Sequence, residues 1–281
     1  MTTPETLFSG YRFPEGCRWH DGLLWFSDMH TGVVYSVDLA ARTTTEVMTI
    51  DGRPSGIGWL PDGSLVLSSM LDRRVLRRSP DGEVSVYCDL SDATPYPIND
   101  LIVDPAGRVI VGEFGYDLYA EAEPQGGSLF GVRADGGYDV LVDDLTFPNG
   151  MAILSTGVLV VAETFGTRLT AFDIAPDGSL TGRRVWAELP DGSTPDGICV
   201  DAEDAIWVSS IVPGRFLRVR EGGEVTDDLQ LDGRLAVDCV LGGPDGRTLL
   251  LSTADSWQPD DTAKSWAGRI ESVPARVAGV E

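Results

Sequence analysis

The sequence has few basic residues, which proteins use to bind nucleic acids and anionic membranes. Lys and Arg number 21 against 44 Asp and Glu, so the formal net charge is −23. Because a protein that binds nucleic acid or an anionic membrane needs a basic face, this balance disfavours both kinds of partner. No apolar stretch approaches the ~20 residues of a membrane span. MTTPETLFSG at the N-terminus has neither the basic nor the apolar segment of a signal peptide. We therefore expect a cytoplasmic protein with a small-molecule substrate.

Histidine and cysteine are also scarce. The histidines are His20 and His30, and so small a number disfavours both Ser-His-Asp catalysis and a zinc site of the usual His/Cys kind. The cysteines form no CxxC pair and stand in apolar or strand-like stretches, so we interpret them as reduced, buried thiols. They are Cys17, Cys88, Cys199 and Cys239.

The chain is rich in residues that form turns. Its 33 glycines and 17 prolines are spread along the whole length, and hydrophobic residues make up 42%. Six units, each an apolar run between two turns, recur about 40 to 50 residues apart, and a second strand-like run follows each unit. No segment has an apolar period of helical type and length. An α/β barrel, which needs a helix after every strand, is therefore disfavoured.

These repeats predict an all-β fold, a six-bladed β-propeller with four-stranded antiparallel blades around a central channel. We expect a single domain over residues 1–281. Closing such a ring needs a strand from one terminus in the blade that the other terminus builds. TLFSGYRF near the N-terminus is the candidate for this strand.

One polar residue takes the same place in every unit. In a propeller these strand starts converge on one mouth of the channel, so we predict a ring of oxygen donors there. Such donors suit a hard cation, Ca²⁺ before Mg²⁺ or Mn²⁺. Each residue taken alone is also an ordinary turn residue that bonds its own backbone. Counting back eight residues from the turn after each innermost strand, or seven in the first unit, reaches Glu15, Ser55, Asn99, Asn149, Asp196 and Asp238.

The motifs FPEG, ND, FPNG and PDG, in this order and spacing, resemble the gluconolactonase/regucalcin (senescence marker protein) family from about Phe13 to Ala254. The resemblance implies a six-bladed propeller that binds one divalent cation and hydrolyses lactones. Ca²⁺ is the first choice for the cation, with Zn²⁺, Mn²⁺ or Mg²⁺ as alternatives.

The same motifs imply roles for single residues. Matched motif by motif, the resemblance implies Glu15, Asn149 and Asp196 as metal ligands. It also implies Asn99, in the ND motif, as a contact of the substrate.

The sequence departs from the family pattern at several places. Pro97 stands where sugar-lactonase relatives carry an Arg that holds sugar hydroxyls, so a sugar lactone is disfavoured. Glu113 replaces an Asn, and Asp238 stands where a small or hydroxyl residue is expected. Asp196 is the first candidate for the catalytic carboxylate that takes a proton from water, with Asp238 and Glu113 as rivals.

Aromatic residues in the loops above the same mouth are the candidate substrate contacts, and they would favour an aromatic or hydrophobic substrate. Core packing is the alternative for each of them. The long loop 115–127 is a candidate cover for the pocket. The aromatic candidates are Tyr96, Phe114, Tyr116, Phe165 and Trp257.

The sequence therefore predicts a divalent-metal-dependent hydrolase of carboxylic ester bonds, a lactonase that opens a lactone or a related cyclic ester. One alternative is a metal-dependent lyase, isomerase or cyclase on the same site, which Pro97, Glu113 and Asp238 motivate. A second alternative is a non-catalytic, ion-binding propeller, because propellers host many functions. The sequence leaves the oligomeric state open.

Overall fold

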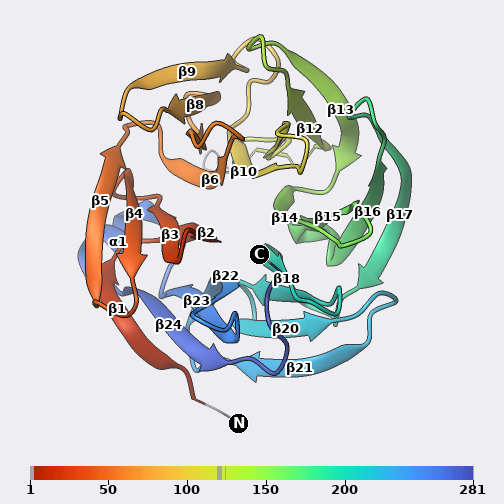
Figure 1. Ribbon diagram of the computed structural model, residues 1–281. Coiled ribbons are helices and arrows are strands. Elements are labelled where there is room, and N and C mark those ends of the chain that lie inside the picture. Colours follow the sequence, from red (N-terminus) through yellow and green to blue (C-terminus); the bar gives the residue numbers. More distant parts are fainter. Residues whose placement is uncertain (1–2, 119–121, 124, 281) are drawn as a thin grey trace.

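The chain folds into six sheets that stand around a central axis (Figure 1). The computed structural model describes residues 3–118, 122–123 and 125–280. Each sheet has four antiparallel strands, with one strand next to the axis and one on the outside of the ring. The all-β, six-bladed propeller predicted from the repeats is confirmed.

Within the first five blades the strands follow one another in the chain from the axis outward. The innermost strands are β2 (Pro14–His20), β6 (Pro54–Trp59), β10 (Ile98–Val103), β14 (Pro148–Ile153), β18 (Pro195–Val200) and β22 (Leu235–Gly242). The second strands are β3 (Leu23–Asp28), β7 (Leu65–Ser69), β11 (Val109–Glu113), β15 (Val158–Glu163), β19 (Ile206–Ser210) and β23 (Thr248–Ala254). The third strands are β4 (Val33–Asp38), β8 (Arg74–Arg78), β12 (Gly127–Val132), β16 (Arg168–Ile174), β20 (Arg215–Val219) and β24 (Gly268–Pro274). The outermost strands are β5 (Thr43–Thr49), β9 (Val84–Asp89), β13 (Tyr138–Leu145), β17 (Leu180–Glu188), β21 (Val225–Gln230) and β1 (Glu5–Tyr11).

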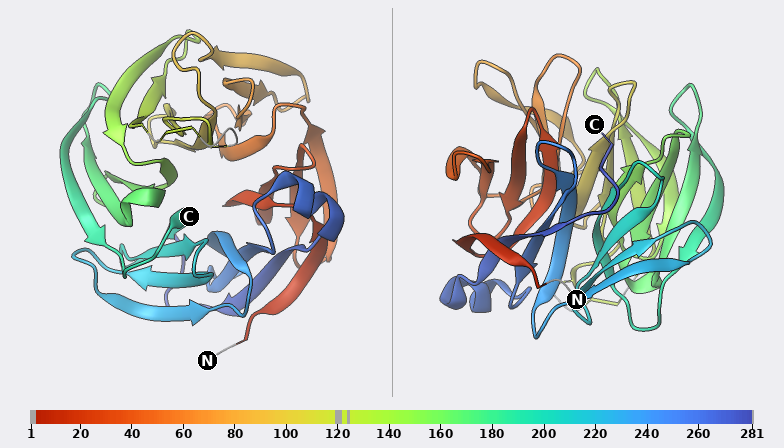
Figure 2. Two further views of the ribbon diagram at one scale, coloured as in Figure 1. Left: turned by 180° about the vertical axis from the view of Figure 1, so that it is seen from behind. Right: turned by 60° about the horizontal axis from the view of Figure 1, so that its bottom comes forward.

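Strand β1 closes the ring. It pairs antiparallel with β24, from Glu5 opposite Ser272 to Tyr11 opposite Gly268. It is thus the outer strand of a blade whose other strands come from the C-terminal end of the chain. Figure 2 shows this red strand beside the blue strands of the same blade. Ring closure by the N-terminal strand, as expected from the sequence, is confirmed.

The sequence at the start of the inner strands lets neighbouring strands come close together. Gly150 follows Asn149 in β14, and a Cβ there would lie 2.5 Å from the backbone oxygen of Asp196 in the next blade. A Cβ at Gly197 in β18 would lie 1.8 Å from Oδ1 of Asp238. Only glycine permits so close an approach. The two glycines therefore narrow the channel and draw the polar residues before them together.

The hydrophobic core lies between neighbouring blades. A cluster of buried side chains fills each of the six interfaces between blades. Phe172 of the fourth blade, for example, packs in one cluster with Leu129 of the third. A seventh cluster, which includes Phe13, Phe114 and Phe147, lies at one mouth of the channel. This last cluster surrounds the candidate site.

A short helix, α1 (Pro259–Ser265), connects β23 to β24. Arg12 fastens the helix to the first blade, because its Nη1 donates to His30 O at 2.8 Å and its Nη2 donates to Pro259 O. His30 Nδ1 lies 2.8 Å from Thr262 Oγ1 of the helix. Burial lowers the pKa of His30 to about 3, so this histidine is neutral. In the parts of the chain that the structure describes, no helix is long and apolar enough to cross a membrane.

Candidate active site

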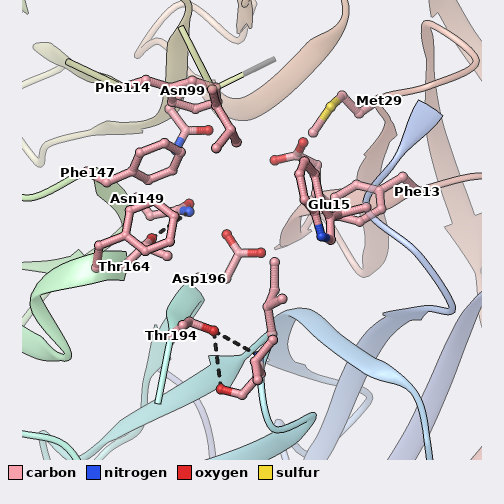
Figure 3. Close-up of a pocket in the computed structure, with 15 residues that line it drawn as sticks. Phe13, Glu15, Met29, Asn99, Phe114, Phe147, Asn149, Thr164, Thr194 and Asp196 are labelled. Carbon is pink, nitrogen blue, oxygen red and sulfur yellow. Dashed lines mark hydrogen bonds between the residues drawn. The ribbon is translucent and has the colours of Figure 1, made fainter. Parts of the chain in front are cut away.

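Four of the predicted ring residues line one pocket at a mouth of the channel. The side chains of Glu15, Asn99, Asn149 and Asp196 point toward a common space (Figure 3). They come from the starts of β2, β10, β14 and β18, and none is more than 8% exposed. The pocket has a volume of about 200 Å³. Four separate blades therefore present two carboxylates and two amides to one small cavity.

Ser55, a fifth ring residue, lies fully buried behind the carboxylate of Glu15. Its Oγ donates a hydrogen bond of 2.7 Å to Oε2 of Glu15 and lies 3.5 Å from Oδ1 of Asn99. Oε1 of Glu15 is buried and has no hydrogen-bond partner among the described residues. One carboxylate oxygen is thus held in place, while the other is available to a ligand.

The two asparagine amides are held by the neighbouring blades. Asn99 Nδ2 donates to the backbone oxygen of Pro148 at 3.1 Å, and Asn149 Nδ2 donates to Thr164 Oγ1 at 3.2 Å. Thr164 Oγ1 in turn donates to the backbone oxygen of Pro195 at 2.7 Å. Because the nitrogens are used in this way, each amide keeps its oxygen as the acceptor for a group in the pocket.

Burial makes it costly to ionise the two carboxylates of the pocket together. Burial raises the pKa of Glu15 well above its usual range, and the charge of Asp196 raises it further. Burial also raises the pKa of Asp196, to which Asp238 adds, whereas the amide of Asn149 lowers it. No Lys, Arg or His is among the described residues that line the pocket. A cation between the two carboxylates would remove this penalty.

The donor set fits a hard divalent cation. Glu15 and Asp196 offer carboxylate oxygens, Asn99 and Asn149 offer amide oxygens, and no imidazole or thiolate lies with them in the described lining. Oxygen donors of this kind are the ligands that Ca²⁺ and Mg²⁺ prefer. Within the described ranges, no cluster of three or more His, Cys, Asp or Glu is placed to hold a metal ion. A cation in this pocket therefore depends on the amide oxygens as well as on the carboxylates.

Comparison with known families agrees with the motifs and the geometry. A model of the SMP-30/Gluconolactonase/LRE-like region matches residues 13–255. The chain belongs to this family. The resemblance read from the motifs of the sequence is thereby confirmed.

Two similar curated proteins are named as lactonases. The chain is 27% identical to a pentonolactonase of Haloferax volcanii over 263 residues, which cover 90% of this chain and 86% of that protein. It is 29% identical to a 6-deoxy-6-sulfogluconolactonase of Pseudomonas putida over 171 residues, which cover 60% of this chain and 57% of that protein. This second match thus spans little more than half the length of either chain.

Solved structures support the fold of the family. A luciferin-regenerating enzyme superposes with a TM-score of 0.84 at 20% identity, covering 99% of this chain and 97% of that chain. The calcium-binding protein regucalcin from Agrobacterium tumefaciens superposes with a TM-score of 0.84 at 22% identity, covering 99% of this chain and 95% of its own. At these identities the likeness shows the propeller fold alone.

Three of the five aromatic candidates line the pocket of this family member. Phe114, Phe165 and Trp257 are among its described lining residues, whereas Tyr96 and Tyr116 are not. Tyr116 is buried and packs against Phe165 with ring centroids 6.4 Å apart. The candidate cover, loop 115–127, includes residues 119–121 and 124, which lie outside the described residues. Of the described part of that loop, Leu118 lines the pocket.

Strand pairing places Asp238 outside the polar ring. In β22, Ala236 and Cys239 are three positions apart in the chain, but their partners in β23 are only two positions apart, so the pairing is irregular between them. In β18, Pro195 and Ile198 pair with residues of β19 in the same way. Asp238 therefore aligns with the glycine of the PDG motif in β18, not with its aspartate. This corrects the count made on the sequence.

Val237 takes the sixth ring position, and the carboxylate of Asp238 supports the backbone beside it. Oδ2 of Asp238 accepts a hydrogen bond from Cys17 N at 2.5 Å, and Oδ1 accepts one from Cys239 N at 2.7 Å. Burial raises the pKa of Asp238 to about 7. The count failed because β22 has one more residue between the ring position and its turn than β18 has. Asp238 thus ties the sixth blade to the backbone two residues after Glu15.

Glu113, the other proposed base, supports the backbone of the loop that follows it. Oε2 of Glu113 accepts a hydrogen bond from Gly115 N at 2.6 Å, and Oε1 accepts one from Ser128 N at 2.9 Å. Burial raises the pKa of Glu113, and these hydrogen bonds oppose the increase. Neither Glu113 nor Asp238 is among the described lining of the pocket. Asp196 is the one candidate base that lines it.

A charged layer beneath the ring was not foreseen from the sequence. Arg18 of β2 reaches across the channel to β10, where its Nη2 lies 2.9 Å from Asp100 Oδ1 and donates to Leu101 O at 2.7 Å. Its Nη1 donates to Cys17 O at 2.9 Å. The partners are 82 positions apart in the chain, so no local pattern in the sequence could pair them.

Threonines in the pocket were also missed. Thr164 follows the last residue of β15, and Thr194 precedes Pro195 at the start of β18. Thr194 Oγ1 accepts a hydrogen bond from Val212 N at 2.8 Å. The signal that could have found Thr164 is its place directly after a second strand, where Met29 and Phe114 also line the pocket.

Proposed function

We propose that the chain is a divalent-cation-dependent lactonase, which hydrolyses a lactone or a related cyclic ester to the open hydroxy acid. The observation that carries this proposal is the burial of Glu15 and Asp196 in one pocket with Asn99 and Asn149, without a cationic side chain among the described lining. Relatives in the same family that are named as lactonases support it. The cytoplasmic location and the single domain over residues 1–281 stay predictions.

Glu15, Asn149 and Asp196 are the proposed ligands of the cation. Oxygen donors favour Ca²⁺ first, with Mg²⁺, Mn²⁺ or Zn²⁺ as alternatives. When bound, a divalent cation polarises an ester carbonyl and stabilises negative charge on its oxygen. The buried, unpaired Oε1 of Glu15 supports this role, because a buried carboxylate oxygen without a partner is otherwise costly.

The chain's own residues supply the proton transfers. Asp196 is the proposed general base and accepts a proton from the water that attacks the lactone carbonyl. Burial raises the pKa of Asp196 in the cation-free chain, whereas a bound cation lowers the pKa of a carboxylate that it contacts. Asp196 is proposed as the base because it is the one candidate base that lines the pocket. Asp196 then returns the proton to the ring oxygen as the acyl C–O bond breaks. Asn99 donates one amide proton to Pro148 O and keeps its second for the substrate.

Pro97 gives no reason to disfavour sugar lactones once its place in the fold is known. It is buried, its backbone oxygen accepts a hydrogen bond from Phe114 N at 3.0 Å, and it is not among the described lining of the pocket. Two relatives, the pentonolactonase and the 6-deoxy-6-sulfogluconolactonase, carry the names of sugar lactonases. A preference for other lactones must therefore rest on the residues that do line the pocket.

The argument for a lyase, isomerase or cyclase loses its support for the same reason. It depended on Pro97, Glu113 and Asp238, and none of the three is among the described lining residues. Among the described residues that line the pocket, no contact favours these reactions over hydrolysis. Hydrolysis is therefore the proposed reaction.

The test is an assay of the chelator-treated protein against aliphatic, aromatic and sugar lactones, with Ca²⁺, Mg²⁺, Mn²⁺ or Zn²⁺ added back. We expect turnover only with a cation, and mass spectrometry should find the ring-opened hydroxy acid. Asp196→Asn should lower kcat by roughly 10²–10⁴-fold, the usual contribution of a positioned base. Asp191→Asn, at an exposed acid, is the matched control.

Each alternative predicts a different result in this assay. Turnover that is equal with and without chelator would contradict the cation requirement. Substrate loss without a hydroxy acid would indicate a lyase, isomerase or cyclase. Cation binding without turnover of any lactone would indicate an ion-binding propeller.

A further inference from the structure

The wall of the pocket above the ring residues is apolar because of one position in the fold. In the first five blades, the residue directly after the second strand reaches either the pocket or the apolar cluster at the mouth. These residues are Met29, Met70, Phe114, Thr164 and Ile211. Phe13 and Phe147, which precede β2 and β14, complete this wall. A substrate ring held at Glu15 and Asp196 therefore lies against hydrocarbon on the side that faces the mouth.

The two hydroxyl groups among the described lining residues have no proton to offer a substrate. Thr164 Oγ1 donates its proton to Pro195 O at 2.7 Å. Thr194 Oγ1 donates its proton to Val212 O at 3.2 Å. A hydroxyl has one proton, so neither threonine can donate to a sugar hydroxyl without losing a bond of its own. Hydroxyls of a sugar lactone that face this wall would therefore meet no free hydroxyl donor in it, and an unpaired, desolvated hydroxyl costs binding free energy.

The described lining of the pocket has no basic side chain that could pair with an anionic substituent of a substrate. Glu15 and Asp196 are the charged residues among the described lining, and both are acids. The chain as a whole has a formal net charge of −23, which repels anions from its surface. A lactone that carries a carboxylate, phosphate or sulfonate would find no basic partner among the described residues of this pocket.

Large apolar side chains stay exposed at the rim of the same pocket. Phe165 is 50% exposed, Val212 52% and Trp257 39%, and all three line the pocket. The cavity of about 200 Å³ is smaller than the ~300–1,000 Å³ of pockets for drug-sized ligands. A compact ring fills it, and any substituent must extend toward the rim. Grouped, exposed apolar side chains beside a cavity are typical of a ligand-binding surface.

We propose that the substrate is an uncharged lactone whose ring carries an apolar substituent, and that Phe165, Val212 and Trp257 bind this substituent. The inference rests on the proposed lactonase function and names the class of its substrate. The polar residues at the base of the pocket act on the ester group, which every lactone has. The wall and the rim select among lactones by the hydrocarbon that they cover.

The test compares kcat/KM for γ-butyrolactone, γ-hexalactone and γ-nonalactone with that for glucono-δ-lactone, using the cation-loaded full chain and subtracting spontaneous hydrolysis. Each methylene that reaches the wall or rim should raise kcat/KM by about threefold to fourfold, the gain expected for burying one CH₂. The increase should level off when the chain extends past the rim. Glucono-δ-lactone should fall at least about 100-fold below γ-nonalactone, because its hydroxyls replace that gain with unpaired polar groups.

Variants at the rim assign the effect to the proposed residues. Trp257→Ala should lower the ratio of kcat/KM for γ-nonalactone to that for γ-butyrolactone by about tenfold, and Phe165→Ala should lower it in the same direction. Trp266→Ala is the matched control, because Trp266 is 49% exposed and does not line the pocket. It should leave this ratio unchanged.

The outcomes separate this inference from the proposed function. If glucono-δ-lactone has the highest kcat/KM, or if chain length has no effect, the inference is overturned and the lactonase function stands. An unchanged ratio in both rim variants also overturns it. If no lactone is hydrolysed with any cation, the proposed function itself fails.

Discussion

Ser55 and Glu15, which lie in neighbouring inner strands, share a hydrogen bond of 2.7 Å between Ser55 Oγ and Oε2 of Glu15. The bond is fully buried, and it leaves Oε1 of Glu15 without a partner among the described residues. The hydroxyl thus fixes the direction in which the carboxylate faces the pocket. Outer-shell contacts of this kind tune how well a ligand side chain holds a metal.

Ser55→Ala should therefore weaken cation binding without removing it. We expect Kd for Ca²⁺ to rise about tenfold to 100-fold, the range found when an outer-shell partner is lost. Isothermal titration on the chelator-treated protein measures this change. Ser68→Ala is the control, since Ser68 is also fully buried in the second blade but bonds a backbone oxygen, that of Gly56, at 3.5 Å. Equal affinity in both variants would show that the hydroxyl of Ser55 does not position Glu15.

Glu15→Gln should have a larger effect, because it removes a proposed ligand charge itself. We expect the affinity for Ca²⁺ to fall by more than about 100-fold, beyond the range of outer-shell changes. The fold should persist, because glutamine has nearly the same shape and its amide can still bond Ser55 Oγ. Titration calorimetry and circular dichroism together check both statements. Glu5→Gln, at an exposed strand residue, is the control. Full cation affinity in Glu15→Gln would remove Glu15 from the ligand set.

The pKa of Asp196 predicts how stability depends on pH when no cation is bound. Burial raises this pKa in the folded chain, so the folded state binds the proton more strongly than the unfolded state does. The contribution of Asp196 to stability therefore falls as pH rises from ~4, the usual carboxyl range, through the raised value. Asn at this position cannot ionise and removes the effect.

In a chelator at pH 8, Asp196→Asn should thus have a higher Tm than the unchanged chain, and the difference should shrink toward pH 5. A tenfold difference in proton affinity between the folded and unfolded states corresponds to ~1.4 kcal/mol, and each kcal/mol to ~2–4 °C in a chain of this size. Excess Ca²⁺ at pH 8 should reverse the order, because the cation stabilises the folded state that binds it. Thermal melts at several pH values measure these differences. A difference that is constant with pH would contradict the assigned cause.

The sequence predicted most of the ring because the ring depends on a repeated local pattern. Pro14, Pro54, Pro148 and Pro195 each open an inner strand, and the next residue faces the channel. A turn residue after each of these strands, glycine in three cases and Asp204 in the fourth, gave a fixed point from which to count back to the ring position. The pattern fails in the sixth blade, where LAVDC has neither the proline nor the glycine and one more residue lies between the ring position and the turn. A count from the turn therefore reached Asp238 in place of Val237.

The wall of the pocket could not be predicted to the same extent. Its residues share a position after the second strand, but in the sequence Met29 and Ile211 look like ordinary core residues, and Thr164 is polar. Tyr116 was predicted to contact the substrate, but this aromatic residue of the long loop packs against Phe147 and is not among the described lining of the pocket. Side-chain direction in loops depends on tertiary packing, so sequence position alone did not determine it.

The close contact between Gly197 and Asp238 gives the last prediction. A Cβ at Gly197 would lie 1.8 Å from Oδ1 and 2.6 Å from Cβ of Asp238. The carboxylate cannot swing away without losing its hydrogen bonds to Cys17 N and Cys239 N. Gly197→Ala should therefore destabilise the fold by roughly 1–3 kcal/mol, as overpacking usually does.

Denaturant unfolding of Gly197→Ala measures this loss, and Gly112→Ala is the control. A Cβ at Gly112, also in a buried strand, would meet its nearest atoms at 3.6 Å, which is an ordinary contact. Combining Gly197→Ala with Asp238→Gly should recover part of the loss, because the second change removes the clashing side chain and neighbouring substitutions are not additive. Two outcomes would contradict this prediction. One is that the losses of stability in the two single variants add fully in the double variant. The other is that Gly197→Ala lowers the free energy of unfolding no more than Gly112→Ala does.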